Sequence, residues 1–484
     1  MRLAMTSLPI HPYAETIREQ VAAHRRLILS APPGTGKSTQ VPQFLLPDAS
    51  TAVVLQPRRI AARSLAARVA AERGEALGET VGYQVRFERA TSAATRLLFA
   101  TYGVFWQRIQ QEPDLPDVSL VILDEFHERT LEADACLAWL ARLQETSRPD
   151  LQLVVMSATL ESERLSEYLG QPPIVEVNAR AHEVAIAYQA PQPHEPLWSQ
   201  AVRGFRHLLS EGLDGSVLIF MPGVGEIRRT VDALEPLCRE RGFKVLELSG
   251  SQTPDAQQKA LSLPASEPCV IVATNVAETS LTIPGVVAVI DSGLARHAAY
   301  DPHRDLDTLH LGLISRQNAT QRAGRAGRLA PGRCLRLWPR THESAMPEAM
   351  APEIARLDLS RLALAAAALP ESLRWLDEPP ADRWVRTQER LHELQALDAE
   401  GRLTPLGRKL LRFPLPPALA RVLMVAKETG CATLAAAMVA LLEAADRRSL
   451  TDDGDLYRLG VALVREPRAR AWGREVGETF RQIR

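Results

Sequence analysis

One group of residues is suited to holding a phosphate. The stretch "APPGTGKST" (residues 31–39) follows the apolar run "LILS" and precedes a helical pattern. Glycines let backbone N–H groups turn inward around phosphate oxygens, and the start of a helix adds a favourable dipole. Lys37 would reach the terminal phosphates and Ser38 would hold Mg²⁺, although Ala31 stands where the longer pattern often has glycine. The predicted phosphate-binding residues are Gly34, Thr35, Gly36, Lys37, Ser38 and Thr39.

A second group of residues follows a buried strand. In "SLVILDEFHER" (residues 119–129) an apolar run leads directly into two acids and a histidine. Three kinds of site compete: a metal centre, an acid/base pair, and the magnesium end of a nucleotide site. A zinc centre is disfavoured because His127 has no second histidine at ligand spacing. An acid/base pair of the glycosidase type is disfavoured because adjacent carboxylates at a strand end point apart. The favoured assignment has Asp124 holding Mg²⁺ and Glu125 deprotonating the attacking water.

A third group is rich in arginine. In "QNATQRAGRAGR" (residues 317–328), Arg322, Arg325 and Arg328 recur every three residues. On a helix such positions share a face, so Arg325 and Arg328 are predicted to point together at a γ-phosphate. Gln321 would position the water. The alternatives are a solvated basic helix or a patch for the RNA backbone, but the repeated glycines disfavour a plain surface helix.

Parallel strands must position these groups. The apolar runs "RLILSA", "TAVVLQ", "RLLFAT", "SLVILDE" and "LQLVVMSAT" alternate with helical patterns and predict a parallel sheet covered on both faces. Ligands bind at the carboxyl ends of such strands. A second set, "GSVLIFMPG", "FKVLELSG", "PCVIVATN" and "GVVAVIDSG", predicts a related α/β domain after a junction near residues 171–180. Beyond about Ala345 the pattern becomes helical.

Composition limits the class of protein. A chain of 484 residues suggests three or four domains, and a formal net charge of −1 means that nucleic acid would bind through local basic patches. The five cysteines are widely spaced, which predicts free thiols in a reducing cytosol. The N-terminus lacks a secretion signal, and the longest weakly polar run is too short for a membrane span. A cytoplasmic protein without membrane contact is predicted.

Taken together, the ordered motifs resemble those of superfamily 2 helicases. "GTGKST", "DEFH", "SAT" (157–159), "ATNVAETSLTIPGV" (273–286) and "QRAGRAGR" occur in the order typical of DEAH-box RNA helicases, and "FMPGVGEIRR" (220–229) is most similar to the bacterial HrpB type. The resemblance implies two tandem RecA-like domains (1–176 and 177–345), a winged-helix domain (346–413) and the start of a helical bundle (414–484). The family usually continues into an oligonucleotide-binding fold, so a truncated chain is expected.

The resemblance also assigns roles to single residues. His127, Ser157 and Thr159 match elements that link the nucleotide state to domain movement. Arg59, Thr101, Thr274 and Asn275 match contacts to the nucleic-acid backbone, Arg68 matches a residue that stacks on the nucleotide base, and Asp291 is a weaker candidate for the ribose. Such contacts carry no sequence information, which suits a motor that grips every nucleotide alike.

Two positions depart from the family pattern. Phe126 replaces the usual alanine, and Leu261 stands where many members place an aromatic residue over the base, so weak base selectivity is expected. The implied function is 3′-to-5′ movement of a monomer on single-stranded RNA, driven by ATP or another nucleoside triphosphate with Mg²⁺. Whether DNA also serves is left open by the sequence. The alternatives are an RNA-stimulated ATPase that remodels ribonucleoprotein with little unwinding, and an ATPase that acts on protein.

Overall fold

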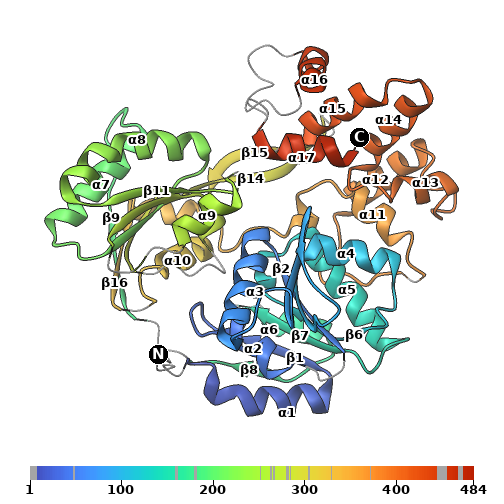
Figure 1. Cartoon of the computed structure of the whole chain (residues 1–484), viewed down its shortest axis with the longest axis horizontal. Helices are drawn as coiled ribbons and strands as arrows, with labels where there is room; N and C mark the ends of the chain where they lie inside the picture. The colour runs from blue at the N-terminus through green and yellow to red at the C-terminus, as the bar shows by residue number, and fades with distance from the viewer. Residues whose placement is uncertain are drawn as a thin grey trace. The chain divides into compact units, whose positions relative to one another are not determined.

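The computed structural model describes most of the chain as two compact units, residues 1–357 and 358–484. The described residues are 8–46, 50–157, 162–178, 182–250, 252–261, 264, 267–278, 283, 285–303, 306–328, 330–370, 372–443, 455–466 and 473–483. Thr159 lies outside them. The first unit contains two α/β lobes, called here the first lobe and the second lobe, which are drawn in blue to teal and in green to yellow in Figure 1.

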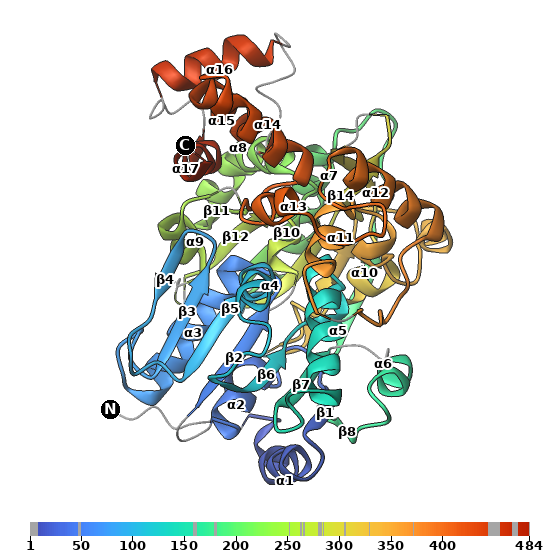
Figure 2. The same ribbon diagram turned by 90° about the vertical axis from the view of Figure 1, so that its right-hand side faces the viewer.

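The first lobe is built on an eight-stranded sheet with the order β4-β3-β5-β2-β6-β7-β1-β8. All neighbours are parallel except β3 and β4, which form a hairpin at one edge (Figure 2). The strands are β1 (Arg26–Ser30), β2 (Thr51–Gln56), β3 (Val81–Val85), β4 (Glu88–Ala90), β5 (Leu97–Thr101), β6 (Val118–Leu123), β7 (Gln152–Ser157) and β8 (Ile174–Glu176). The helices are η1 (His11–Tyr13), α1 (Ala14–His24), α2 (Lys37–Phe44), α3 (Arg59–Arg73), α4 (Tyr102–Gln111), η2 (Phe126–Glu128), α5 (Leu131–Glu145) and α6 (Ser162–Tyr168).

The second lobe is built on a six-stranded parallel sheet with the order β11-β12-β10-β13-β16-β9. Its strands are β9 (Val184–Tyr188), β10 (Ser216–Phe220), β11 (Lys244–Leu248), β12 (Cys269–Ala273), β13 (Val286–Asp291) and β16 (Gly332–Arg336). Its helices are α7 (Leu197–Ser210), α8 (Val224–Arg241), α9 (Pro254–Leu261), η3 (Asn275–Ala277) and α10 (Arg316–Ala323). Buried apolar side chains cover both faces of the sheet, as a parallel sheet requires.

A long antiparallel hairpin leaves the second lobe after β13. It consists of β14 (Leu294–Asp301) and β15 (Leu306–Leu313), which pair along their whole length. The chain then returns through α10 and β16 to η4 (Arg340–Ala345) and η5 (Glu353–Ala355). Residues 347–356, called here the connector, lie near the end of the first unit.

The second unit is helical. Its helices are α11 (Ser360–Ala366), α12 (Ala381–Glu393), α13 (Pro405–Leu410), α14 (Pro417–Glu428), α15 (Ala432–Glu443), α16 (Leu456–Arg465) and α17 (Gly473–Ile483). Leu397 and Leu403 form an isolated antiparallel bridge on the two sides of a turn. One hydrophobic cluster joins α11, α12 and α13, and another joins α14 to α17.

The predicted α/β class is confirmed: two largely parallel sheets in tandem precede a helical unit. The strands that the sequence patterns did not predict are β3, β4, β8, β9, β14, β15 and β16. Most of these are edge or hairpin strands, whose apolar residues are interrupted by charged or small ones. All five cysteines are free thiols. Within the described ranges, no helix has both the length and the apolar character needed to cross a bilayer.

Candidate nucleotide site between the two lobes

The phosphate-binding loop lies between β1 and α2, as the sequence predicts. Gly34 and Gly36 have φ angles of 87° and 93°. Residues other than glycine rarely adopt such positive φ angles. A Cβ atom on Gly36 would lie 2.8 Å from Cδ1 of Leu8, so crowding also excludes a larger residue there. Helix α2 begins at Lys37, and the loop therefore directs backbone N–H groups toward the space in front of the helix.

Lys37 lies in the interior of the site, and only 3% of its surface is exposed. Its Nζ atom donates to the carbonyl oxygen of Ala31 at 3.4 Å and lies 3.7 Å from Oε2 of Glu125. The ammonium group is therefore placed between the phosphate-binding loop and the acids of the second motif.

The two acids follow the end of β6. Gln56 donates to Oδ2 of Asp124 at 2.6 Å, and the backbone N–H of Glu125 donates to its Oδ1 at 2.9 Å. Burial and the nearby charge of Glu125 raise the pKa of Asp124 to about 6, while Lys37 and a hydrogen bond from Ser38 oppose the rise. Glu125 has φ 51°, a left-handed conformation that is uncommon for a non-glycine residue and turns the chain abruptly after the strand.

His127 contacts Glu125 rather than solvent. Its Nε2 atom lies 3.5 Å from Oε2 of Glu125, and burial lowers the pKa of the imidazole. Among the described residues, no group of three or more histidine, cysteine or acidic side chains has the arrangement of a metal site.

The arginine motif does not form the continuous helix that its spacing predicts. Helix α10 ends at Ala323, and residues 324–327 form turns. Gly327 is tightly enclosed, because a Cβ atom there would lie 2.6 Å from Cγ2 of Val184. This correction has a physical cause: the glycines weaken the helix, and packing against the start of β9 replaces it. Arg322 consequently lies in a different environment from Arg325 and Arg328.

Arg325 and Arg328 face the first lobe. Burial lowers the pKa of both guanidinium groups, that of Arg328 to about 10, and the charge of Glu125 opposes the fall in each case. A Cβ atom on Gly34 would lie 3.9 Å from Cγ of Arg328, so this side chain reaches the phosphate-binding loop. Arg325 also donates from Nε to the carbonyl oxygen of Glu278 at 2.8 Å. Buried guanidinium groups beside the phosphate-binding loop form a site that would bind an anion through charge-assisted hydrogen bonds.

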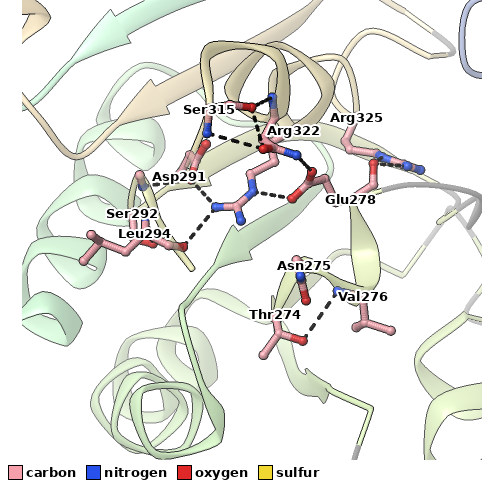
Figure 3. Close-up of polar contacts among 12 residues, drawn as sticks. Thr274, Asn275, Val276, Glu278, Asp291, Ser292, Leu294, Ser315, Arg322 and Arg325 are labelled. Atoms are coloured by element: carbon pink, nitrogen blue, oxygen red, sulfur yellow. Dashed lines mark hydrogen bonds and ion pairs between the residues drawn. The ribbon is translucent and has the colours of Figure 1, made fainter. Parts of the chain in front are cut away.

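Arg322 points the other way, into the second lobe (Figure 3). It is 1% exposed, and it donates to Oε2 of Glu278 at 2.9 Å and to Oδ1 of Asp291 at 2.8 Å. Its guanidinium carbon lies 4.8 Å from the centre of the Phe220 ring. Asp291 is fully buried and also accepts from the N–H of Gly293 at 2.9 Å. This geometry favours a structural role for Asp291, and its contact with a ribose stays a prediction.

The two lobes are joined by an arginine that the sequence analysis did not select. Arg58 precedes α3, and its Nη1 atom donates to the carbonyl oxygen of Asn275 in the second lobe. Its Nε atom lies 3.3 Å from both carboxylate oxygens of Glu128, and its Nη2 atom lies 3.1 Å from one of them. Gln56, Glu278 and Arg58 were all missed, although each is adjacent or near to a residue that was chosen.

A polar cavity of about 160 Å³ lies beside this bridge. Side chains of both lobes and of the connector line it, including His127, Gln321, Arg322 and Glu353. Gln321 therefore lines the same cavity as His127 and Glu128 of the acidic motif.

The predicted nucleic-acid contacts lie at strand ends. Thr101 and Ser157 end β5 and β7, while Thr274 follows β12 and its hydroxyl accepts from the N–H of Val276 at 3.5 Å. Arg59 is exposed on the first turn of α3. Asn275 is also exposed. The structure therefore places these residues at the edges where the sequence predicts them, and their contacts with nucleic acid stay predictions.

Arg68 and Leu261 bear on base recognition. The Arg68 side chain is 70% exposed and its Nε atom lies 2.6 Å from Oε1 of Glu72. Glu72 in turn accepts from the side-chain amide of Gln40 at 2.8 Å, which ties this pair to the helix of the phosphate-binding loop. Leu261 packs against the hydrophobic cluster of the second lobe.

The donor groups fit magnesium and a triphosphate. The hydroxyl of Ser38 and the carboxylate of Asp124 already contact each other and are hard oxygen ligands of the kind that Mg²⁺ takes together with phosphate oxygens. Lys37, Arg325 and Arg328 supply positive charge around the same loop.

Comparison with known proteins matches three segments of the chain. The DEAD/DEAH box helicase domain matches residues 11–167, the helicase conserved C-terminal domain matches 200–330, and the winged-helix part of the helicase-associated domain (HA2) matches 388–415. The segments cover both lobes and part of the second unit.

Whole-chain relatives agree with these matches. The chain is 39% identical over 472 residues to the ATP-dependent RNA helicase HrpB of Escherichia coli K12, covering 95% of this chain and 57% of that protein. It is 37% identical over 459 residues to the Schizosaccharomyces pombe pre-mRNA-splicing factor ATP-dependent RNA helicase prp22, covering 91% and 39%. A crystal structure of the Escherichia coli DEAH/RHA helicase HrpB superposes with a TM-score of 0.83 at 35% identity, covering 96% of this chain and 61% of that chain. The chain thus spans less than two thirds of each.

Proposed function

The chain belongs to the DEAH/RHA family of helicases, and from that membership we propose that it couples ATP hydrolysis to movement on single-stranded RNA. The observation that carries the proposal is the convergence of the two lobes on one phosphate cradle. Glu125 of the first lobe interacts electrostatically with Arg325 and Arg328 of the second, and Arg328 reaches Gly34. Hydrolysis that removes the γ-phosphate would remove an anion that holds the lobes together.

We propose the following division of work at the triphosphate. Lys37 neutralises the terminal phosphates, and Ser38 with Asp124 holds Mg²⁺. Bound Mg²⁺ supplies charge neutralisation at the phosphate oxygens. Glu125 accepts a proton from the attacking water, which Gln321 helps to position. Arg325 and Arg328 stabilise the negative charge of the transition state, as positioning and electrostatics dominate phosphoryl transfer.

The proposed grip on RNA uses the polar ends of the strands. Arg59 and Thr101 in the first lobe, and Thr274 and Asn275 in the second, would bind successive backbone positions. His127, Ser157 and Thr159 would connect these contacts to the nucleotide state, and Arg68 would stack on the nucleotide base. Contacts of this kind are independent of base sequence. The 3′-to-5′ direction and action as a monomer are further parts of the proposal that follow from the resemblance of the motifs. A cytoplasmic location is proposed from the sequence.

One set of assays tests the proposal. ATP hydrolysis is measured without polymer and with single-stranded RNA, single-stranded DNA or duplex, and strand separation is measured beside it with overhangs on either end. We expect stimulation by single-stranded RNA and separation from a 3′ overhang. Stimulation without separation would favour a remodelling ATPase, and polymer-independent hydrolysis would overturn the role of RNA. Lys37→Ala serves as the inactive control.

A further inference from the structure

The connector is hydrogen-bonded to both lobes. At its start, the N–H groups of Arg316 and Gln317 in α10 donate to the carbonyl oxygens of Pro347 and Glu348 at 2.9 and 3.1 Å. Toward its end, the N–H of Glu353 donates to the carbonyl oxygen of Arg129 in the first lobe at 3.0 Å. The segment therefore attaches at one end to the arginine motif and at the other to the chain that follows the acidic motif.

Glu353 makes the attachment to the first lobe through its side chain as well. Its Oε2 atom accepts from the N–H of Leu131, the first residue of α5, at 3.1 Å. A carboxylate at this position satisfies a helix N–H that has no partner within the helix and interacts favourably with the helix dipole. The cap comes from a residue 222 positions away in the sequence.

Further hydrogen bonds hold the turn that Glu353 contacts. Arg129 has φ 46°, and its Nε atom donates to Oδ1 of Asp134 at 2.8 Å. Thr130 caps the same helix by accepting from the N–H of Ala133 at 3.2 Å. Glu125 precedes Arg129 by four residues and stands at the start of the short helix η2, which ends at this turn.

Arg356 extends the path to the β14–β15 hairpin. Its Nη2 atom lies 3.2 Å from Oε1 of Glu353, and its Nη1 atom donates to the carbonyl oxygen of Ala298 in β14. The N–H of Tyr300, also in β14, donates to the carbonyl oxygen of Arg356 at 2.8 Å. One pair of side chains thus connects the acidic turn of the first lobe with a strand of the second.

We propose that Glu353 and Arg356 are positioning residues that transmit the state of the acidic motif to the β14–β15 hairpin. The inference rests on the proposed function only for its link to RNA. The pair also lines the polar cavity, together with His127 and Gln321. Neither side chain contacts the phosphate-binding loop, which separates their role from catalysis.

The activity test compares two quantities: the coupling, which is the number of strands separated per ATP hydrolysed, and the rate of hydrolysis without RNA. Glu353→Ala and Arg356→Ala should leave hydrolysis without RNA within about twofold and lower the number of strands separated per ATP by about fivefold to tenfold. Glu353→Gln, which can still accept from Leu131, should retain most of the coupling. Glu348→Ala is the matched control, because its exposed side chain lies in the same connector and pairs with Arg316 alone.

A second measurement keeps the inference separate from the proposed function. Hydrogen exchange of the β14–β15 amides is followed with and without a non-hydrolysable ATP analogue. The wild-type hairpin should change its exchange on binding, and Arg356→Ala should lose that change while still binding the analogue. If the variants couple normally or the hairpin responds in all of them, the connector does not transmit the signal. If hydrolysis is not stimulated by RNA but exchange behaves as expected, only the proposed function fails.

Discussion

The guanidinium of Arg58 in the first lobe donates a hydrogen bond to the carbonyl oxygen of Asn275 in the second. The same side chain binds Glu128, which lies three residues after Glu125. One residue therefore contacts the acidic motif on one side and, on the other, the segment predicted to bind RNA. Because each contact uses a different nitrogen, both are made at once.

Replacing Arg58 should weaken communication between RNA and the nucleotide. We expect Arg58→Ala to reduce RNA-stimulated hydrolysis by about tenfold, with a smaller effect on hydrolysis without RNA, because a charge-assisted contact between the lobes is lost. Steady-state hydrolysis over a range of RNA concentrations measures the change. Arg73→Ala, at the far end of the helix that follows Arg58 and paired with Glu75, should behave as wild type. Equal effects of the two variants would contradict the bridging role.

The general base is tested by an isosteric change. Glu125→Gln keeps the size of the side chain but cannot accept a proton, so we expect hydrolysis to fall by about 10² or more while ATP still binds. Lys37→Ala should instead weaken binding of the nucleotide itself. Fluorescent-nucleotide titration and phosphate release separate the two effects. Native hydrolysis rates in Glu125→Gln would assign the base elsewhere.

Arg328 is expected to act on the transition state. Arg328→Ala should lower the hydrolysis rate by about 10² to 10³ and change ATP affinity by less than about fivefold. Single-turnover kinetics beside equilibrium binding provides the measurement. Arg333→Ala, whose half-exposed side chain lies near Glu211, is the control in the same lobe. Loss of binding with an unchanged rate would rule out the proposed role.

Arg322 should matter for stability rather than for catalysis. Its removal leaves Asp291 and Glu278 buried without their cation, so we expect Arg322→Ala to lower the free energy of unfolding by about 3 to 5 kcal/mol. Arg316→Ala, on the exposed side of the same helix, should cost less than about 0.5 kcal/mol. Chemical denaturation followed by circular dichroism compares them. A stable Arg322→Ala protein with impaired hydrolysis would place Arg322 in the catalytic site instead.

Glu353 should make stability depend on pH. Burial, and next the negative charge of Glu132, raise the pKa of Glu353 from 4.5 to about 7, while Arg356 and the N–H of Leu131 oppose the rise and Glu128 adds to it. A raised pKa means that the folded state binds the proton more tightly. The wild type should therefore lose on the order of 2 kcal/mol relative to Glu353→Gln as pH rises from about 4.5 through about 7.

Thermal melting of both proteins between about pH 5 and pH 8 measures this difference, and titrations common to the two proteins cancel. A difference that stays constant with pH would show that Glu353 has an ordinary pKa. A wild type that gains stability relative to Glu353→Gln as pH rises would show that the cap and Arg356 outweigh burial.

The candidate nucleotide-binding residues and the central strands that carry them could be predicted from the sequence. Continuous apolar runs ending in small or polar residues identified the central strands of both sheets, and the carboxyl ends of parallel strands necessarily meet at one edge. For this reason Lys37, Asp124 and Glu125 could be grouped before their distances were known. These signals are local in sequence or follow from strand direction alone.

The environments of the three arginines and the contacts that join the lobes became visible only in the folded structure. Equal spacing made Arg322, Arg325 and Arg328 look equivalent, but α10 ends at Ala323, which buries the first in an ion-pair network and directs the other two toward the first lobe. Arg58 contacts Asn275, and Glu353 contacts Leu131, each more than 200 residues away. Pairing across such distances depends on how the chain returns on itself, and periodicity and motif spacing carry no information about that.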